Sequence, residues 1–147
     1  MTHHDDRSAR RLLCAGATIA GLGVAAGAFG AHGLREQLSL ASLETFRTGA
    51  GYQLLHGVAI VAIAGAMSHF NRRRMRIAGW LLVIGVVLFS GSLYLLSLSG
   101  IRAFGLVTPV GGGVLLLGWG VLILASLRAE SPSGGSAGGR TSSAPGR

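Results

Sequence analysis

Residues 72–99 read RRRMRIAGWLLVIGVVLFSGSLYLLSLS, an arginine cluster followed by a run over 77–99 without a charged side chain. A helix needs about 20 mostly apolar residues to cross the hydrocarbon core of a bilayer. Positive charge beside such a segment is typical of its cytoplasmic end. The stretch therefore predicts a transmembrane helix over 77–99, with its cytoplasmic end at the arginines.

The rest of the chain repeats this pattern. Of its 147 residues, 50% are hydrophobic and only 12% are charged, about half the usual share in soluble domains. Three further apolar segments, at about 12–31, 52–68 and 105–127, also lack Asp, Glu and Arg. The sequence predicts an all-α integral membrane protein with a four-helix transmembrane bundle over residues 12–127.

Polar segments flank and connect these spans. Residues 1–11 form a polar N-terminal head, and residues 128–147 form a Gly/Ser/Pro-rich tail that is expected to be disordered. The connector 32–51 is long and keeps several apolar residues, so we expect a helix from about Ser42 that continues into the second span.

The arginines predict the orientation. The net charge is +8 and all 13 basic residues are arginines, mostly in short clusters between apolar runs, which indicates membrane topology and not nucleic-acid binding. With both termini cytoplasmic, ten arginines lie inside and three outside. The inner set is Arg7, Arg10, Arg11, Arg72, Arg73, Arg74, Arg76, Arg128, Arg140 and Arg147, and the outer set is Arg35, Arg47 and Arg102. The cluster at 72–76 is the main topology signal, and contact with anionic lipids is expected at the cytoplasmic face.

The first span also has features of a signal peptide. A basic stretch precedes its apolar run, and small-residue sites of the A-x-A type lie at 26–28. Its apolar run is long for a signal peptide, so we expect an uncleaved transmembrane helix.

Polar side chains gather at one end of the four predicted spans. In the orientation above, this is the outer end, and the residues are His32, Tyr52, Gln53, His56, Ser92, Tyr94 and Thr108. Tyr52 and His56 are spaced i,i+4, and Gln53 and His56 i,i+3, so the three can share a helix face. If the first two spans are neighbours, His32 can approach His56. The pattern predicts a polar cluster at the outer leaflet.

The chemistry of this cluster has several interpretations. Its side chains can form hydrogen bonds that hold the helices together, relay protons, or bind a metal or a lipid headgroup. Two histidines fall short of the usual three or four metal ligands, so no metal site is predicted. No nucleophile triad, HExxH motif or phosphate-binding loop is present, so no catalytic residue and no cofactor is predicted. The single cysteine, Cys14, excludes an internal disulfide.

Glycines in two spans indicate close helix packing. Gly23 and Gly27 have the GxxxG spacing by which helices associate in lipid, and Gly111, Gly112 and Gly113 are consecutive. We expect these residues to pack inside the bundle, with self-association as the alternative. Thr108 followed by proline predicts the start of the fourth helix.

Four motifs together resemble a known family. They are GAFGAHGL (27–34), FRTGAGYQLLHGVAI (46–60), LFSGSLYLLSLSG (88–100) and TPVGGGVLLLGW (108–119). They are similar to the YgdD-type small inner-membrane proteins, a domain-of-unknown-function family with mitochondrial relatives. The resemblance implies four transmembrane helices, an intact first span and a location in the bacterial inner membrane. It implies no established activity.

Three functions are compatible with this sequence. We expect a structural or accessory membrane protein, not an enzyme, that forms a homo-oligomer or joins a larger membrane complex. A transporter or channel component for a small solute or proton is the alternative, although the usual internal repeats of transporters are missing. A membrane enzyme or binder that acts on a lipid or quinone-like ligand is a second alternative.

Overall fold

The computed structural model describes residues 3–127, which form four long helices. These are α1 (His3–His32), α2 (Leu40–Ala66), α3 (Arg72–Ser99) and α4 (Val107–Leu127), with a short 3₁₀ helix, η1 (Arg102–Leu106), before α4. All four helices are long and apolar enough to cross a membrane. The predicted all-α, four-helix membrane architecture is confirmed. The prediction of a disordered tail concerns residues 128–147, which lie outside the described part.

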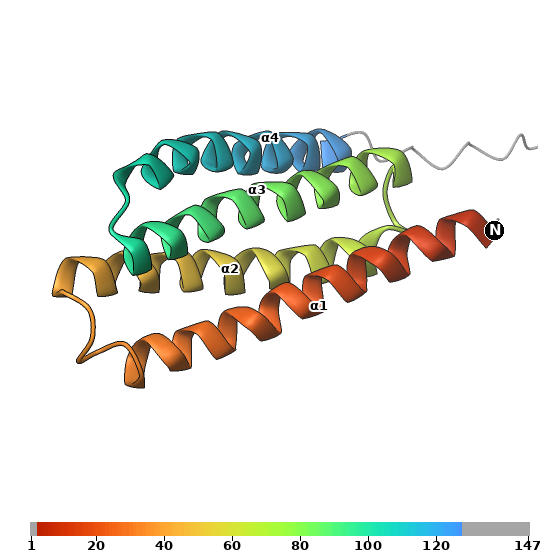
Figure 1. Cartoon of the computed structure of the whole chain (residues 1–147). Coiled ribbons are helices and arrows are strands. Elements are labelled where there is room, and N and C mark those ends of the chain that lie inside the picture. The colour runs from red at the N-terminus through yellow and green to blue at the C-terminus, as the bar shows by residue number, and fades with distance from the viewer. Residues whose placement is uncertain (1–2, 128–147) are drawn as a thin grey trace, which may run out of the picture.

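The helices alternate in direction and lie in chain order across the bundle (Figure 1). α1 packs mainly on α2, α2 on α3 and α3 on α4, whereas α1 touches α3 only slightly. α2 and α3 are therefore the central helices, and α1 and α4 cover them from opposite sides. Because neighbouring helices are antiparallel, the start of α1, the α2–α3 turn and the end of α4 share one end of the bundle.

Two helices begin earlier than the apolar runs suggest. α1 starts within the polar head, and α2 starts at Leu40, before the predicted span at 52–68 and close to the helix start expected at about Ser42. Ser39 caps α2 by accepting a hydrogen bond from the backbone N–H of Ser42 at 3.2 Å. The apolar side of this first part of α2 packs on the end of α1, through a cluster of Leu34, Leu43 and Phe46. As a consequence, Tyr52 and His56 lie near the middle of α2 and not at its end.

The ends of α3 are defined by local hydrogen bonds. Asn71 caps its start by accepting from the backbone N–H of Arg74 at 3.1 Å. Gly100 ends it in the left-handed conformation (φ 71°), which a residue without a Cβ adopts at little cost, and its N–H donates to Leu96 O at 2.9 Å. α4 continues from η1 and begins at Val107, so Thr108 lies inside the helix and not at its N-cap.

Glycines bring the helices together along two seams. In the α1–α2 seam, a Cβ built on Gly23 would lie 2.8 Å from Leu54 N, and one on Gly57 would collide with the backbone of Ala20. In the α3–α4 seam, a Cβ on Gly111 would lie 2.5 Å from Phe89 N. Only glycine allows these backbones to come so close.

The other predicted packing glycines do not all belong to these seams. A Cβ built on Gly112 would make ordinary contacts of 3.7 Å with the Phe89 ring. A Cβ built on Gly27 or Gly113 would have no neighbouring atom within 4 Å. The expectation that Gly27 and Gly113 pack inside the bundle is therefore wrong. Gly27 lies outside the seam because the α1–α2 contact follows the seven-residue spacing of Gly16, Gly23 and Gly30. It does not follow the four-residue spacing of GxxxG.

The arginines divide between the two ends of the bundle. Within residues 3–127, seven lie at the end that holds the start of α1 and the α2–α3 turn, namely Arg7, Arg10, Arg11, Arg72, Arg73, Arg74 and Arg76. The other end holds three, Arg35, Arg47 and Arg102. The fold therefore gathers the basic clusters of two separate segments, 7–11 and 72–76, at a single end.

Candidate functional site

His56 is the most buried ionisable side chain of the candidate cluster, with 3% of its surface exposed. Its Nδ1 lies 2.8 Å from Tyr52 O, one turn earlier in α2, and Trp119 of α4 donates its indole N–H to Nε2 at 3.3 Å. A carbonyl only accepts and an indole N–H only donates. The two bonds together require the neutral tautomer with its proton on Nδ1. Both ring nitrogens of His56 are thus occupied, and the second bond joins α2 to α4.

Aromatic rings surround this histidine. The Tyr52 ring stacks on His56 at a centroid distance of 5.7 Å and lies 4.5 Å from the Phe89 ring of α3. The Trp119 ring meets His56 edge-on at 6.1 Å. Tyr52 is itself 42% exposed on the outside of the bundle. His56 is therefore buried and enclosed by neighbouring rings.

Gln53 joins three helices. Its Nε2 donates to Ile19 O of α1 at 3.0 Å, and its Oε1 accepts from the Tyr94 hydroxyl of α3 at 2.8 Å. The Tyr94 ring packs against Phe46 at a centroid distance of 4.7 Å. The bond to Ile19 O reaches a backbone carbonyl inside α1, which is an unusual partner for a side chain from another helix. Gln53 therefore ties α1 to the two central helices.

Ser92 and Thr108 connect α3 to α4. Their hydroxyl oxygens are 2.8 Å apart, and Ser92 Oγ also lies 2.8 Å from Phe89 O. The single proton of Ser92 goes to the carbonyl, because a carbonyl cannot donate. Thr108 is then the donor to Ser92. This bond explains the role of Thr108, which the sequence assigned to the start of α4.

His32 lies apart from the other candidates. It is exposed at the end of α1, whereas the residue next to His56, Gly57, lies against Ala20. The distance along α1 from Ala20 to His32 is about 18 Å at 1.5 Å per residue. The expected approach of His32 to His56 is therefore wrong, because α2 begins at Leu40 and carries His56 deep into the bundle. The remaining candidates form separate bonded groups from the bundle centre toward one end, not a single cluster at one depth.

Two residues that the sequence did not single out belong to this region. Nothing in the apolar sequence of α4 marks Trp119 as the partner of His56. Ser90 of α3 is 2% exposed, and its hydroxyl has no hydrogen-bond partner among the described residues. Ser90 borders a crevice of about 230 Å³ between α1 and α3, with Gln53 and Tyr94 at its polar side. The other lining residues are Ile19, Leu22, Val86, Val87 and Gly91.

The arrangement limits the chemistry available. Within the described residues, no group of three His, Cys, Asp or Glu side chains is placed to hold a metal ion. Cys14 is exposed on α1, toward the arginine-rich end. The site therefore contains cross-helix hydrogen bonds at three places and an apolar crevice beside Ser90.

Comparison with known proteins assigns the chain to a family. The profile of a family described as "Protein of unknown function (DUF423)" matches residues 26–112, from the second half of α1 to the first part of α4. The chain belongs to the DUF423 family. A UPF0382 membrane protein of Staphylococcus epidermidis is 42% identical to this DUF423 protein over 113 residues, which are 77% of this chain and 92% of the relative.

Two further relatives extend the comparison. The UPF0382 membrane protein YwdK of Bacillus subtilis is 37% identical over 114 residues, 77% of this chain and 93% of YwdK. The UPF0382 inner membrane protein YgdD of Escherichia coli is 41% identical over 111 residues, 71% of this chain and 80% of YgdD. No solved structure matches this DUF423 protein. Together with its four membrane-length helices, these relatives make it a multi-pass inner-membrane protein of the YgdD type.

Proposed function

We propose that this DUF423 protein has a structural or accessory role in the membrane and no catalytic activity of its own. The observation that carries the proposal is that both ring nitrogens of His56 are hydrogen-bonded, Nδ1 to Tyr52 O of its own helix and Nε2 to Trp119 of α4. An ionisable residue inside a span is by default a functional candidate. Here both ring nitrogens are occupied and one of the bonds joins α2 to α4, which favours a structural role over a chemical one.

Gln53 and Tyr94 support the same interpretation. They bond to each other, and Gln53 also donates to the backbone of α1, so one side chain links three helices inside the bundle. The acidic side chains Glu36 and Glu44 are exposed at the end of the bundle away from the α2–α3 turn. Among the described side chains, none therefore forms an acid–base pair with His56.

The proposed orientation has both termini in the cytoplasm. Its support is the gathering of seven arginines at one bundle end against three at the other. Cysteine labelling of a Ser68→Cys variant in a Cys14→Ser background tests it, because Ser68 lies exposed in the α2–α3 turn. Labelling only after the cell membrane is opened supports the orientation, and labelling of intact spheroplasts from outside contradicts it.

The accessory role predicts a partner, which is either a second copy of the chain or a larger membrane complex. Native electrophoresis of protein extracted gently from its host membrane should show a discrete species larger than one chain. An exclusively monomeric protein under these conditions would contradict the proposal.

A proton-flux assay separates this proposal from the transporter alternative. Liposomes that contain the purified protein and a trapped pH dye are given a pH gradient. We expect the gradient to decay as fast as in empty liposomes, because His56 is enclosed and fully bonded. Faster decay that disappears in the His56→Ala variant would favour the transporter.

The crevice between α1 and α3 supports one second candidate, a binding site for a lipid- or quinone-like ligand. It has apolar walls and a few polar groups at one side, as small-molecule sites commonly do. A short-chain benzoquinone is a suitable probe in a thermal-shift assay. Gly91→Leu fills the crevice, and Gly65→Leu is a matched control because Gly65 also faces open space. A shift in the wild type and the control, but not in Gly91→Leu, supports the candidate, and no shift in the wild type rejects it.

A further inference from the structure

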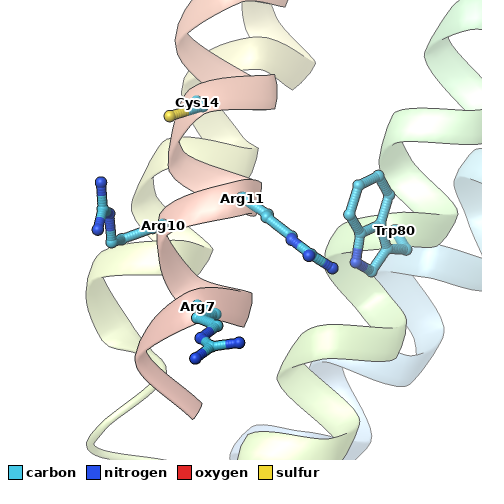
Figure 2. A pocket seen from close by; sticks show the side chains of 5 residues that line it. All are labelled: Arg7, Arg10, Arg11, Cys14 and Trp80. Carbon is cyan, nitrogen blue, oxygen red and sulfur yellow. The ribbon is translucent and has the colours of Figure 1, made fainter. Parts of the chain in front are cut away.

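A second pocket lies at the arginine-rich end of the bundle, between α1 and α3. It has a volume of about 470 Å³ and is lined by Arg7, Arg10, Arg11, Cys14 and Trp80 (Figure 2). It is separate from the polar groups around His56, and the proposed function does not involve it. Its walls combine three cations with an indole ring.

The packing of α1 on α3 explains how this pocket forms. Leu12 is fully buried, and a Cβ built on Gly79 would lie 2.9 Å from Leu12 Cδ1, so the two helices meet at this point. Arg11 and Trp80 each neighbour one of these contact residues and emerge beside the contact. Figure 2 shows Arg11 reaching from α1 toward the Trp80 indole, whereas Arg10 points away from α3. Arg7, one turn before Arg11, lies on the side of the pocket nearer the helix start.

The arginines of this pocket are exposed and follow one another closely on α1. No described carboxylate forms an ion pair with Arg7, Arg10 or Arg11, and all three side chains are exposed. They follow one another at spacings of three and one residues, so their charges lie close together on α1 and repel one another. A bound anion would relieve this repulsion. Guanidinium groups favour phosphate oxygens, to which they can donate two parallel hydrogen bonds.

The position of the pocket along the helices indicates where that anion comes from. Arg11 directly precedes the apolar run of α1, which begins at Leu12, and arginines at such a boundary extend their heads into the lipid headgroup layer. Trp80 is 39% exposed on the outside of α3, and tryptophan is enriched at this depth of a bilayer. The pocket therefore offers cations at headgroup level and an aromatic wall just below.

We propose that this pocket binds the phosphate of an anionic phospholipid. Arg7 and Arg11 hold the phosphate oxygens, and the Trp80 ring packs on the glycerol and the first part of an acyl chain. This differs from a general attraction of basic residues to an anionic surface, because the site is a specific pair of helices with an indole wall. Arg73 and Arg76 lie at the same bundle end but outside the pocket, so they provide a matched comparison.

Native mass spectrometry of the full-length protein tests the proposal. The protein is released from bilayers of phosphatidylglycerol and phosphatidylcholine, and the bound lipid is counted. We expect the wild type to retain phosphatidylglycerol, and the Arg7→Gln/Arg11→Gln variant to lose retention on the order of tenfold. The Arg73→Gln/Arg76→Gln variant removes the same charge at the same end and should retain the lipid within about twofold. Equal losses in the two variants would overturn the site in favour of diffuse attraction.

Trp80 fluorescence provides a second readout that does not depend on charge removal. The chain has two tryptophans, so Trp119→Phe leaves Trp80 as the only one. In phosphatidylcholine vesicles with a minor fraction of acyl-brominated phosphatidylglycerol, Trp80 should be quenched more strongly than with the same fraction of brominated phosphatidylcholine. Equal quenching by the two lipids would overturn the proposal. A response of Trp80 in detergent to inorganic phosphate alone, equal to the response to phosphatidylglycerol, would assign the site to a soluble phosphate and overturn the lipid.

Discussion

The substitution Gly57→Ala tests the α1–α2 seam. A Cβ at this position would lie 2.7 Å from Ala20 Cα and 2.8 Å from Ala20 Cβ. Ordinary carbon–carbon contacts are about 3.5–4.0 Å, so the two helices must separate by about 1 Å. The obstacle is backbone, which cannot rotate away as a side chain does. We therefore expect an overpacking cost of about 1–3 kcal/mol in the free energy of unfolding.

Gly51→Ala is the control in the same helix. Nothing lies within 4 Å of a Cβ built on Gly51, so this variant should gain the higher helix propensity of alanine, about 1 kcal/mol, without a clash. Both variants carry the same propensity gain, so their difference isolates the cost of the clash. Reversible unfolding in mixed micelles with increasing sodium dodecyl sulfate, followed by far-ultraviolet circular dichroism, measures it. A difference below about 0.5 kcal/mol would refute the close approach of α1 and α2.

Three further predictions concern other contacts. Gly23→Ala and Gly111→Ala should each destabilise the bundle by about 1–3 kcal/mol, whereas Gly27→Ala and Gly113→Ala should not, and the same micelle assay compares them. Tyr94→Phe should lower the free energy of unfolding by about 1 kcal/mol, because Gln53 Oε1 loses its donor. The double variant Tyr94→Phe/Gln53→Leu should lose less stability than the sum of the losses in the two single variants. Ser90→Ala should leave stability unchanged or raise it by up to about 1 kcal/mol, since the buried hydroxyl has no partner among the described residues, and a lower unfolding midpoint would show that it has one.

The four helices could be predicted from the sequence because apolar length alone decides membrane crossing. The start of α2 was predicted close to its observed position, at about Ser42 against Leu40, but the membrane span was placed only at 52–68. The first turns of α2 mix Glu44 and Arg47 with Leu43 and Phe46, so average hydropathy is low even though one side packs on Leu34 of α1. Starting the span at Tyr52 put His56 about one turn from the outer end of that span. The structure places it in the middle, and the expected pair with His32 is lost for this reason alone.

The partners within the site could not be predicted from the sequence. Residue spacing places Tyr52 and His56 on one face of their own helix, and they do stack. It says nothing about which residue of α4 lies opposite, so Trp119 was missed. Likewise, the GxxxG spacing in the sequence does not show which of its two glycines faces the neighbouring helix. The α1–α2 contact repeats every seven residues and includes Gly23 but not Gly27.

The central claim is that His56 holds helices together through its bond to Trp119. A double-mutant cycle of His56→Ala and Trp119→Phe, measured as unfolding free energy in micelles, tests it directly. Cross-helix hydrogen bonds in membrane proteins give coupling energies of about 0.6 kcal/mol on average and up to about 1.7 kcal/mol. We predict a favourable coupling energy within this range for His56 and Trp119. The control pair is His56→Ala with Trp80→Phe. Trp80 does not contact His56, so the effects of these two changes on the unfolding free energy should simply add. Full additivity of His56→Ala with Trp119→Phe would contradict the account.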